Sequence, residues 1–136
     1  MKKVNPSVYV LVILIVFLFS LTAFQQSTIP DGIVVAIKGG NAKELSKYFN
    51  TNIELIIMEK EGVYSKSQAE QILKDFFLKN TPTKFIKNHE GGKAGSKYCI
   101  GTLYANTGQY RLSFFFEKNT KEELVIINFR IEDDNN

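Results

Sequence analysis

Apolar residues change their spacing at Pro82, and this change constrains the fold more than any other feature of the sequence. Within residues 67–80 they recur every three or four positions, as on one face of a helix. After Pro82 apolar and polar residues alternate, which is typical of strands. Helices followed by a run of hairpins predict an α+β fold, in which helices pack on an antiparallel sheet. The predicted strands are 83–90, 96–106, 109–118 and 122–132.

Two short helices are expected ahead of this region. The first has a start signal at Thr28–Asp31 and stops at Gly39–Gly40, because glycine tolerates the left-handed backbone that commonly ends a helix. The second begins at Asn41, which forms a predicted capping box with Glu44. These signals predict a small helical layer built before the sheet.

The third helix is the clearest of the three. Ser67 and Glu70 have the spacing of a capping box, and the residues behind them have helical periodicity. Residues 53–58 predict a strand between the second and third helices, interrupted by a turn around Gly62.

The N-terminus has the pattern of an export signal. Met1–Lys3 is a short basic start, Val8–Phe19 is an unbroken apolar run, and small residues follow. Residues 1–25 are therefore predicted to be a signal peptide, and residues 26–136 a single domain that is periplasmic or secreted. If the apolar run is counted on through Phe24, an uncleaved segment that anchors the chain in the inner membrane is the alternative.

Composition excludes several classes of protein. The chain is 44% hydrophobic and 23% charged, a balance that excludes intrinsic disorder. Its net charge is +3, and both Lys2 and Lys3 belong to the export signal, so the domain is nearly neutral and nucleic acid is not expected as a partner. Cys99 and His89 are the single cysteine and histidine, too few for an ordinary zinc site, and no metal or cofactor is predicted. Cys99 is expected to be a buried apolar residue.

The strand pattern also predicts how the hairpins pair. A tight turn at 106–108 places Tyr98 opposite Phe116 and Ile100 opposite Phe114, and both faces of the resulting sheet are apolar. Three helices can cover only one of these faces. A second copy of the chain, or a partner protein, is expected to cover the other.

Polar residues on adjacent strands allow two interpretations. Together with tyrosines they can line a pocket for a small apolar or anionic ligand, since such sites combine apolar walls with a few polar groups. Alternatively, the arginines pair with acids at the sheet rim and the tyrosines pack. On the first interpretation the pocket residues are Tyr48, Tyr98, Tyr104, Tyr110, Arg111, Asn128 and Arg130.

The opposite face of the same strands predicts an interface, because aromatic and apolar residues gather there. A negative charge at Phe115 or Phe129 is then expected to split an assembly and to leave the monomer folded. The predicted interface residues are Leu103, Phe115, Val125, Ile127 and Phe129.

The order of elements resembles the nuclear transport factor 2-like (cystatin-like) fold, a cone in which a curved sheet wraps around helices. More narrowly, Ile29–Val34 and Gly40–Phe49 resemble a family of exported Bacteroidetes-type proteins that is catalogued only as a domain of unknown function. The resemblance implies the fold and no activity, because enzymes and binding modules share it.

Catalytic residues are not predicted. Enzymes of this fold often use an acid, a histidine or a tyrosine that projects from the sheet, yet the middles of the three long strands hold no carboxylate. Glu54 is the one acid inside an apolar strand, and it is expected on a solvated face. A non-catalytic binding or interaction module is therefore the predicted function. A small-ligand carrier, or a weak hydrolase or isomerase, is the alternative.

Overall fold

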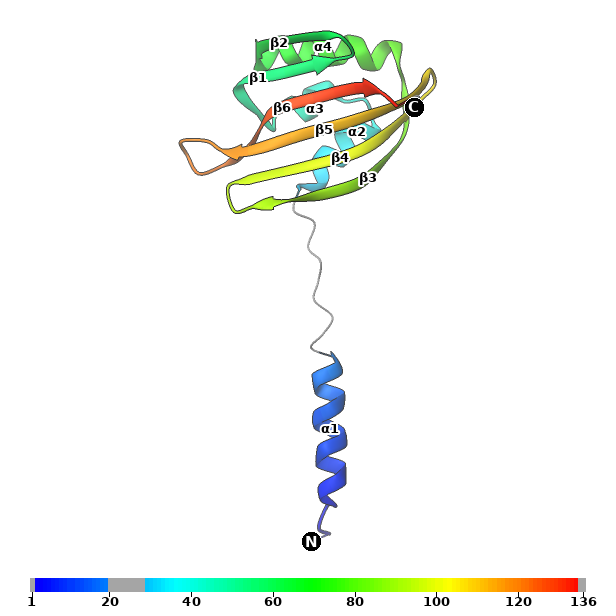
Figure 1. The fold of residues 1–136 in the computed structure, drawn as a ribbon, viewed down its shortest axis with the longest axis vertical. Helices are drawn as coiled ribbons and strands as arrows, with labels where there is room; N and C mark the ends of the chain where they lie inside the picture. Colours follow the sequence, from blue (N-terminus) through cyan, green and yellow to red (C-terminus); the bar gives the residue numbers. More distant parts are fainter. Residues whose placement is uncertain (1, 20–28, 135–136) are drawn as a thin grey trace.

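A computed structural model describes residues 2–19 and 29–134 of the chain (Figure 1). Helix α1 lies in the N-terminal segment, and all other elements belong to the domain that follows. None of the helices in the described residues is both long enough and apolar enough to cross a membrane. The elements are α1 (Pro6–Phe19), α2 (Asp31–Lys38), α3 (Ala42–Ser46), β1 (Phe49–Ile57), β2 (Lys60–Ser65), α4 (Lys66–Lys79), β3 (Pro82–Lys93), β4 (Ser96–Ala105), β5 (Gly108–Lys118) and β6 (Leu124–Asp133).

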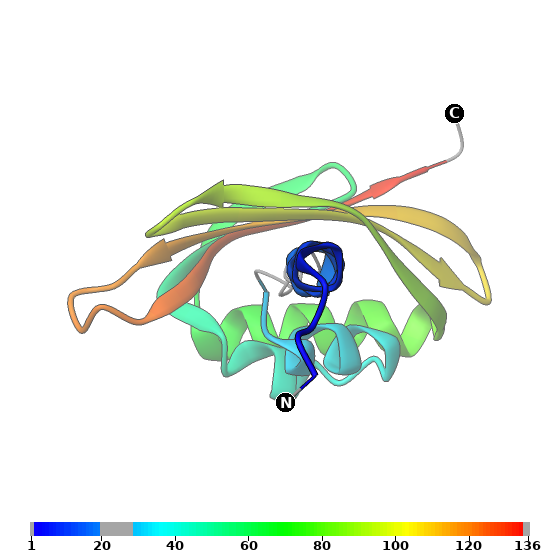
Figure 2. The same ribbon diagram turned by 90° about the horizontal axis from the view of Figure 1, so that it is seen from below.

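One six-stranded sheet organises the domain, with the strand order β2-β1-β6-β5-β4-β3. Neighbouring strands are antiparallel except for β1 and β6, which are parallel. The sheet arches over α2, α3 and α4, which lie together on its concave side (Figure 2). The predicted α+β fold is confirmed, and a parallel pair between the first and last strands is added to it.

The observed helix ends agree in part with those predicted from the sequence. Gly40 ends α2 in the left-handed region at φ 60°, as expected, and Asn41 caps α3 by accepting a hydrogen bond from the backbone N–H of Glu44 at 3.1 Å. The Glu44 carboxylate does not return to Asn41 but pairs with Lys47 at 2.7 Å. Helix α2 begins after Pro30 without a side-chain cap, and the predicted cap at Thr28 lies outside the described residues.

The predicted cap of α4 is wrong by two residues. Ser65 is the N-cap, its hydroxyl accepts from the N–H of Gln68 at 3.3 Å, and the Gln68 side chain accepts from the N–H of Ser65 at 3.0 Å. Glutamine completes a capping box as well as glutamate does, so both spacings fitted the rule. Glu70 instead accepts from the hydroxyl of Ser46, which ties α4 to α3.

The first hairpin is larger than predicted. Strand β1 starts at Phe49 rather than at 53, and Lys60–Ser65 forms β2, a strand that the sequence did not predict. The chain turns at Met58, whose φ is 56°, and not around Gly62, which lies inside β2. Gly62 leaves room for the ring of Tyr64, which would lie 2.8 Å from a Cβ at that position.

The register between β4 and β5 differs from the prediction by one residue. The turn contains only Asn106 and Thr107, so Tyr98 lies opposite Phe115 and Cys99 opposite Phe114. Because side chains alternate between the two faces of a strand, a shift of one residue exchanges the faces of the whole partner strand. As a result, the predicted pocket residues and the predicted interface residues, which were expected on opposite faces of the sheet, are each divided between the two faces.

Phenylalanines fill the space between the sheet and the helices. Phe114 and Phe129 stack with centroids 5.5 Å apart and planes 13° apart, and Phe49 packs against Phe129 at 6.1 Å. All three side chains are at most 1% exposed. Such pairs contribute about 0.5–1.5 kcal/mol beyond the burial of their area. The core thus combines residues from the N-terminal and the C-terminal parts of the domain, and it contains no disulfide bond.

Candidate functional site

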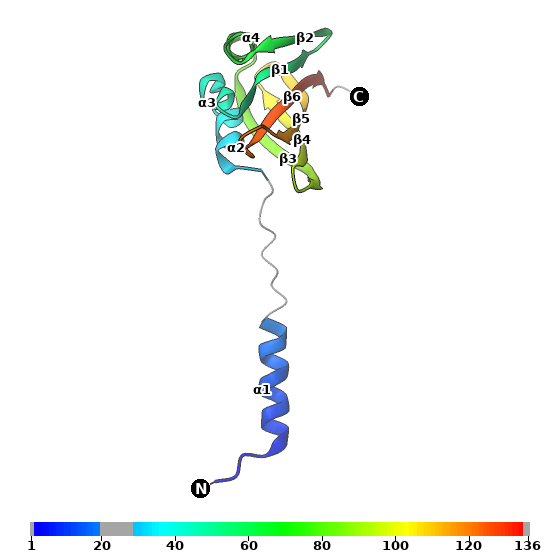
Figure 3. The same ribbon diagram turned by 90° about the vertical axis from the view of Figure 1, so that its left-hand side faces the viewer.

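The convex side of the sheet is left uncovered by the helices. Helices α2, α3 and α4 all lie on the concave side, and no element within residues 29–134 lies over the other (Figures 2 and 3). We call this convex side the outer face. On the three central strands it consists of Tyr98, Ile100, Thr102, Tyr104, Arg111, Ser113, Phe115, Asn128, Arg130 and Glu132.

An aromatic row crosses the outer face. Phe115 lies between Asn128 on β6 and Tyr98 on β4, and the Phe115 and Tyr98 rings have centroids 6.4 Å apart. Beyond Tyr98 the row ends at Gly91, where a Cβ would meet the Tyr98 hydroxyl at 3.1 Å and its ring at 3.3 Å. Phe115 remains 43% exposed although it lies on a central strand. The row therefore presents a large apolar side chain to solvent.

Charged and polar groups lie beside this row. Arg130 pairs with Glu132 at 3.1 Å, and both side chains are 42% exposed. Arg111 is exposed and lies between Glu132 on β6 and Thr102 on β4. Both signs of charge thus lie within one patch, next to the aromatic row.

Glu54 is the acid that the sequence placed on a solvated face, and it is half-buried. Its carboxylate accepts a hydrogen bond from the side-chain N–H of Asn128, across the parallel β1–β6 pair. The other amide atom of Asn128, Oδ1, is buried and has no hydrogen-bond partner among the described residues. Asn128 therefore links β1 to β6 on the outer face.

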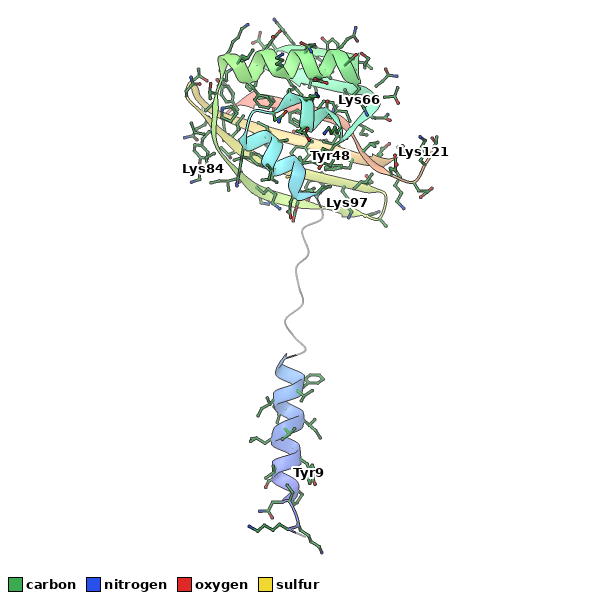
Figure 4. All side chains as sticks on the ribbon, turned by 180° about the vertical axis from the view of Figure 1, so that it is seen from behind. Tyr9, Tyr48, Lys66, Lys84, Lys97 and Lys121 are labelled. Carbon is green, nitrogen blue, oxygen red and sulfur yellow. The ribbon has the colours of Figure 1, made fainter. Side chains whose placement is uncertain are left out.

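The predicted pocket residues do not converge. Tyr110 is 6% exposed and packs edge-on against Phe76 at 5.3 Å, beneath the sheet. Tyr48 lies on the helix side, where its hydroxyl covers Gly32 (Figure 4). The other five predicted residues, Tyr98, Tyr104, Arg111, Asn128 and Arg130, lie on the outer face, which is convex. A pocket lined by all seven does not exist in this fold.

The predicted interface residues separate in the same way. Leu103 and Phe129 are fully buried under the helices, so their placement on an exposed face is wrong. Phe115 is exposed, and Val125 is half-buried opposite the exposed Glu117. Ile127 is the unpaired residue of a β-bulge, since Phe115 pairs with Asn128 and Phe116 with Ile126. The bulge changes the alternation along β6, and nothing in its sequence signals it.

Cys99 is buried on the concave side, as expected. Burial, and secondarily the nearby Glu90 carboxylate, raises the pKa of its thiol from 9.0 to about 11, which the Lys87 ammonium partly opposes. A thiol with this pKa is protonated and a poor nucleophile at neutral pH. Burial and the raised pKa therefore both disfavour a role for Cys99 as a reactive thiol.

Solved structures from Bacteroides are similar to this chain. A protein of the DUF4783 family from Bacteroides ovatus ATCC 8483 is 32% identical, with a TM-score of 0.76 over 82% of this chain and 100% of that chain. One from Bacteroides uniformis ATCC 8492 is 33% identical, with a TM-score of 0.76 over 80% of this chain and 100% of its own. Since these solved chains align over their whole length with the domain described here, such a domain folds on its own.

More distant structures share the fold alone. A protein with a cystatin-like fold from Nostoc punctiforme PCC 73102 is 7% identical, with a TM-score of 0.62 over 78% of this chain and 73% of that chain. A structure whose name contains NTF2, the abbreviation of nuclear transport factor 2, is 13% identical, with a TM-score of 0.61 over 74% of this chain and 90% of that chain. The predicted nuclear transport factor 2-like fold is confirmed.

No curated protein matches the chain. The model of one family, "Domain of unknown function (DUF4783)", matches residues 30–132, which is most of the chain and includes every strand of the sheet except the final residue of β6. The chain belongs to the DUF4783 family.

Proposed function

We propose that this protein is a non-catalytic binding module that forms a homodimer through the outer face of its sheet. The observation that carries the proposal is Phe115, which is 43% exposed on a central strand of a six-stranded sheet whose concave face carries the helices. Aromatic residues are enriched at protein interfaces, and exposed apolar patches often mark such interfaces. Tyr98 supports Phe115 from the neighbouring strand and widens the apolar area.

The distribution of charge favours a second copy as the partner. A two-fold interface uses the same patch on both subunits, so the patch must complement itself. Arg111 and Arg130 lie among Glu54 and Glu132 on the outer face, and this arrangement lets cations of one copy meet carboxylates of the other. A patch of one sign would repel itself.

The size of the face fits the same interpretation. Six strands that are spaced about 4.8 Å apart, of which β2 has six residues and the others nine to twelve, project onto roughly 24 Å by 33 Å, or about 800 Å². Specific interfaces bury about 800 Å² on each partner. The projected area of the outer face is therefore of the same order as the area that a stable dimer buries.

The test is the mass of the assembly of residues 26–136, measured by native mass spectrometry and by light scattering after size exclusion. We expect a dimer for the parent domain and a folded monomer for Phe115→Glu. Leu78→Glu is the matched control, because Leu78 is 72% exposed on α4, away from the outer face. This control is expected to remain a dimer.

A monomeric parent domain at high concentration contradicts homodimerisation, and so does a Phe115→Glu dimer of unchanged stability. If the parent domain is a monomer but is recovered from its producing cell with another protein that Phe115→Glu releases, a hetero-partner replaces the second copy.

Export is part of the same proposal. Lys2 and Lys3, followed by the apolar helix α1, support a signal peptide over residues 1–25. We expect the protein recovered from the periplasm or the medium to have lost this segment by intact mass. Full-length protein in the membrane fraction would support the anchored alternative, and full-length protein in the cytoplasm would contradict export.

A further inference from the structure

A groove opens between α4 and the β1–β2 hairpin, at the edge of the sheet farthest from β3. Its volume is about 320 Å³, at the lower end of the range for sites that bind small molecules. It lies on the concave side, where α4 runs beside the two strands (Figures 1 and 3), and is separate from the outer face. It is lined by Leu55, Ile57, Lys60, Tyr64, Ile72, Asp75, Phe76, Lys79 and Asn80.

The floor and one wall of the groove are apolar. Leu55 and Phe76 are 1% and 8% exposed, and Ile57 and Ile72 are half-buried beside them. The ring of Tyr64 lies against the backbone of Gly62, in space that any larger residue would occupy. Ring and floor together provide a surface for a small apolar group such as a phenyl ring or a short alkyl chain.

Three charges surround this floor. Lys60 lies on β2, and Asp75 and Lys79 lie on α4, and all three are exposed. Asp75 and Lys79 are four residues apart on a helix, a spacing at which opposite charges usually pair, yet no ion pair within 4.0 Å joins any of these three groups in residues 29–134. Two ammonium groups beside the groove therefore lack a carboxylate partner.

Asn80 already has partners within the protein. Its Oδ1 accepts from the hydroxyls of Tyr110 and Thr107, and its Nδ2 donates to the carbonyl of Phe76. It fixes the end of α4, so the lysines are left as the groups that can recognise a polar part of a ligand.

We propose that this groove binds a small amphipathic monocarboxylate, with the apolar body on Leu55, Phe76 and Tyr64 and the carboxylate between Lys60 and Lys79. Lys60 and Lys79 together with Asp75 leave one net positive charge, which matches a single carboxylate, and the two ammonium groups supply its hydrogen-bond donors. Asp75 disfavours a ligand with a second negative charge near it. The site is independent of dimerisation, because it lies on the other side of the sheet.

The experiment is a titration of 15N-labelled residues 26–136 with 3-phenylpropionate, followed by amide shifts. 3-Phenylpropanamide, which has the same apolar body without the charge, is the ligand control. We expect saturable amide shifts at the groove residues. The dissociation constant of the amide is expected to be only about five- to tenfold higher than that of the acid, because a charge-assisted hydrogen bond at an exposed site loses part of its strength to water.

Variants locate the site. Lys60→Ala combined with Lys79→Ala is expected to reduce the affinity for the acid to that for the amide, and Ile72→Glu to abolish binding of the acid. Lys74→Ala, a neighbouring exposed lysine of α4 that does not line the groove, is expected to leave affinity unchanged. The amide spectrum of each variant reports whether it is folded.

Two results overturn the proposal. One is the absence of saturable shifts at groove residues up to roughly 10 mM ligand, where binding is worth less than about 3 kcal/mol. The other is equal binding of the acid and the amide, which would show that the lysines do not recognise the ligand. Neither result bears on the outer face.

Discussion

The hydroxyl of Tyr110 on β5 donates a hydrogen bond of 2.9 Å to Oδ1 of Asn80 at the end of α4. The hydroxyl of Thr107 donates to the same oxygen at 2.6 Å, and Nδ2 of Asn80 donates to the carbonyl of Phe76 at 3.0 Å. One side-chain amide thus joins the last turn of α4, the β4–β5 turn and strand β5. The two hydroxyl oxygens also lie 2.8 Å apart, so the three polar groups are in mutual contact.

Tyr110→Phe removes one donor from this set and keeps the ring that packs on Phe76. We expect the free energy of unfolding to fall by about 1 kcal/mol, the usual net value of such a hydrogen bond, in a urea titration. Tyr104→Phe is the control, because Tyr104 lies on the outer face with Lys84 over its ring at 5.6 Å, and its removal of a hydroxyl is expected to change little. Equal losses in the free energy of unfolding of the two variants would contradict the role of Asn80 in linking α4 to β5.

Phe129→Ala and Phe115→Ala test which face of the sheet is buried. Phe129 is 0% exposed and stacked on Phe114, so its truncation is expected to cost about 3–5 kcal/mol in the free energy of unfolding. Phe115→Ala is expected to cost less than half as much in the monomer. Chemical denaturation of both variants, at a concentration where each is a monomer, gives the comparison, and similar losses would mean that the β5–β6 register is wrong.

Ser65→Ala and Ser67→Ala test the start of α4. Ser65 accepts from the N–H of Gln68, and its removal is expected to cost about 1 kcal/mol of stability, as for other N-cap serines. Ser67 lies inside the first turn, and its alanine variant is expected to be at least as stable as the parent, because alanine favours helix. Thermal unfolding of the two variants side by side decides between the two caps, and a larger loss at Ser67 would favour the cap that the sequence first suggested.

The thiol of Cys99 leads to a prediction of how the stability of the domain depends on pH. Burial raises the pKa of its thiol to about 11 in the folded state, above the ordinary value of 9.0. Below pH 9 the thiol is protonated in both states and contributes a constant amount. Between pH 9 and pH 11 only the unfolded state ionises, so the stability contributed by the protonated thiol is lost as pH rises through this window.

The measurement compares the parent domain with Cys99→Ala in urea titrations from pH 8 to pH 11. Every other ionisable group is the same in both proteins, so the difference in slope isolates the thiol. We expect the parent domain to lose stability more steeply than the variant. Parallel curves, or rapid labelling of the native thiol by iodoacetamide at pH 8, would contradict a buried protonated group.

Local patterns in the sequence correctly predicted the positions of several helices and strands. The periodicity behind Ser67 gave α4, the glycines after Lys38 ended α2, and the alternation after Pro82 gave four strands whose ends agree within three residues. Each of these features depends on residues that are close along the chain. The fold class follows from their order.

The candidate site depends on features that are not local. The turn at Asn106–Thr107 is one residue shorter than predicted, which exchanges the two faces of β5 relative to β4. The bulge at Ile127 adds one residue to β6, which exchanges the faces of β6 beyond it and places Phe129 on the buried side. Each shift moves a strand's side chains from one face to the other, so two short irregularities decide that Phe115 is outside and Phe129 inside. Strand β2 escaped prediction because its residues, Lys60–Ser65, form an exposed edge with little apolar content.

The parallel contact between β1 and β6 links Glu54 to Asn128, which are 74 residues apart along the chain. A polypeptide that leaves a ribosome or a translocation channel N-terminus first presents β1 and β2 long before their partner strand emerges. Until then the only partner available to β1 is β2, and a two-stranded hairpin is marginal in water. Closure of the domain therefore coincides with delivery of its final strand, and truncation before Leu124 would divide the sheet into two separate pieces.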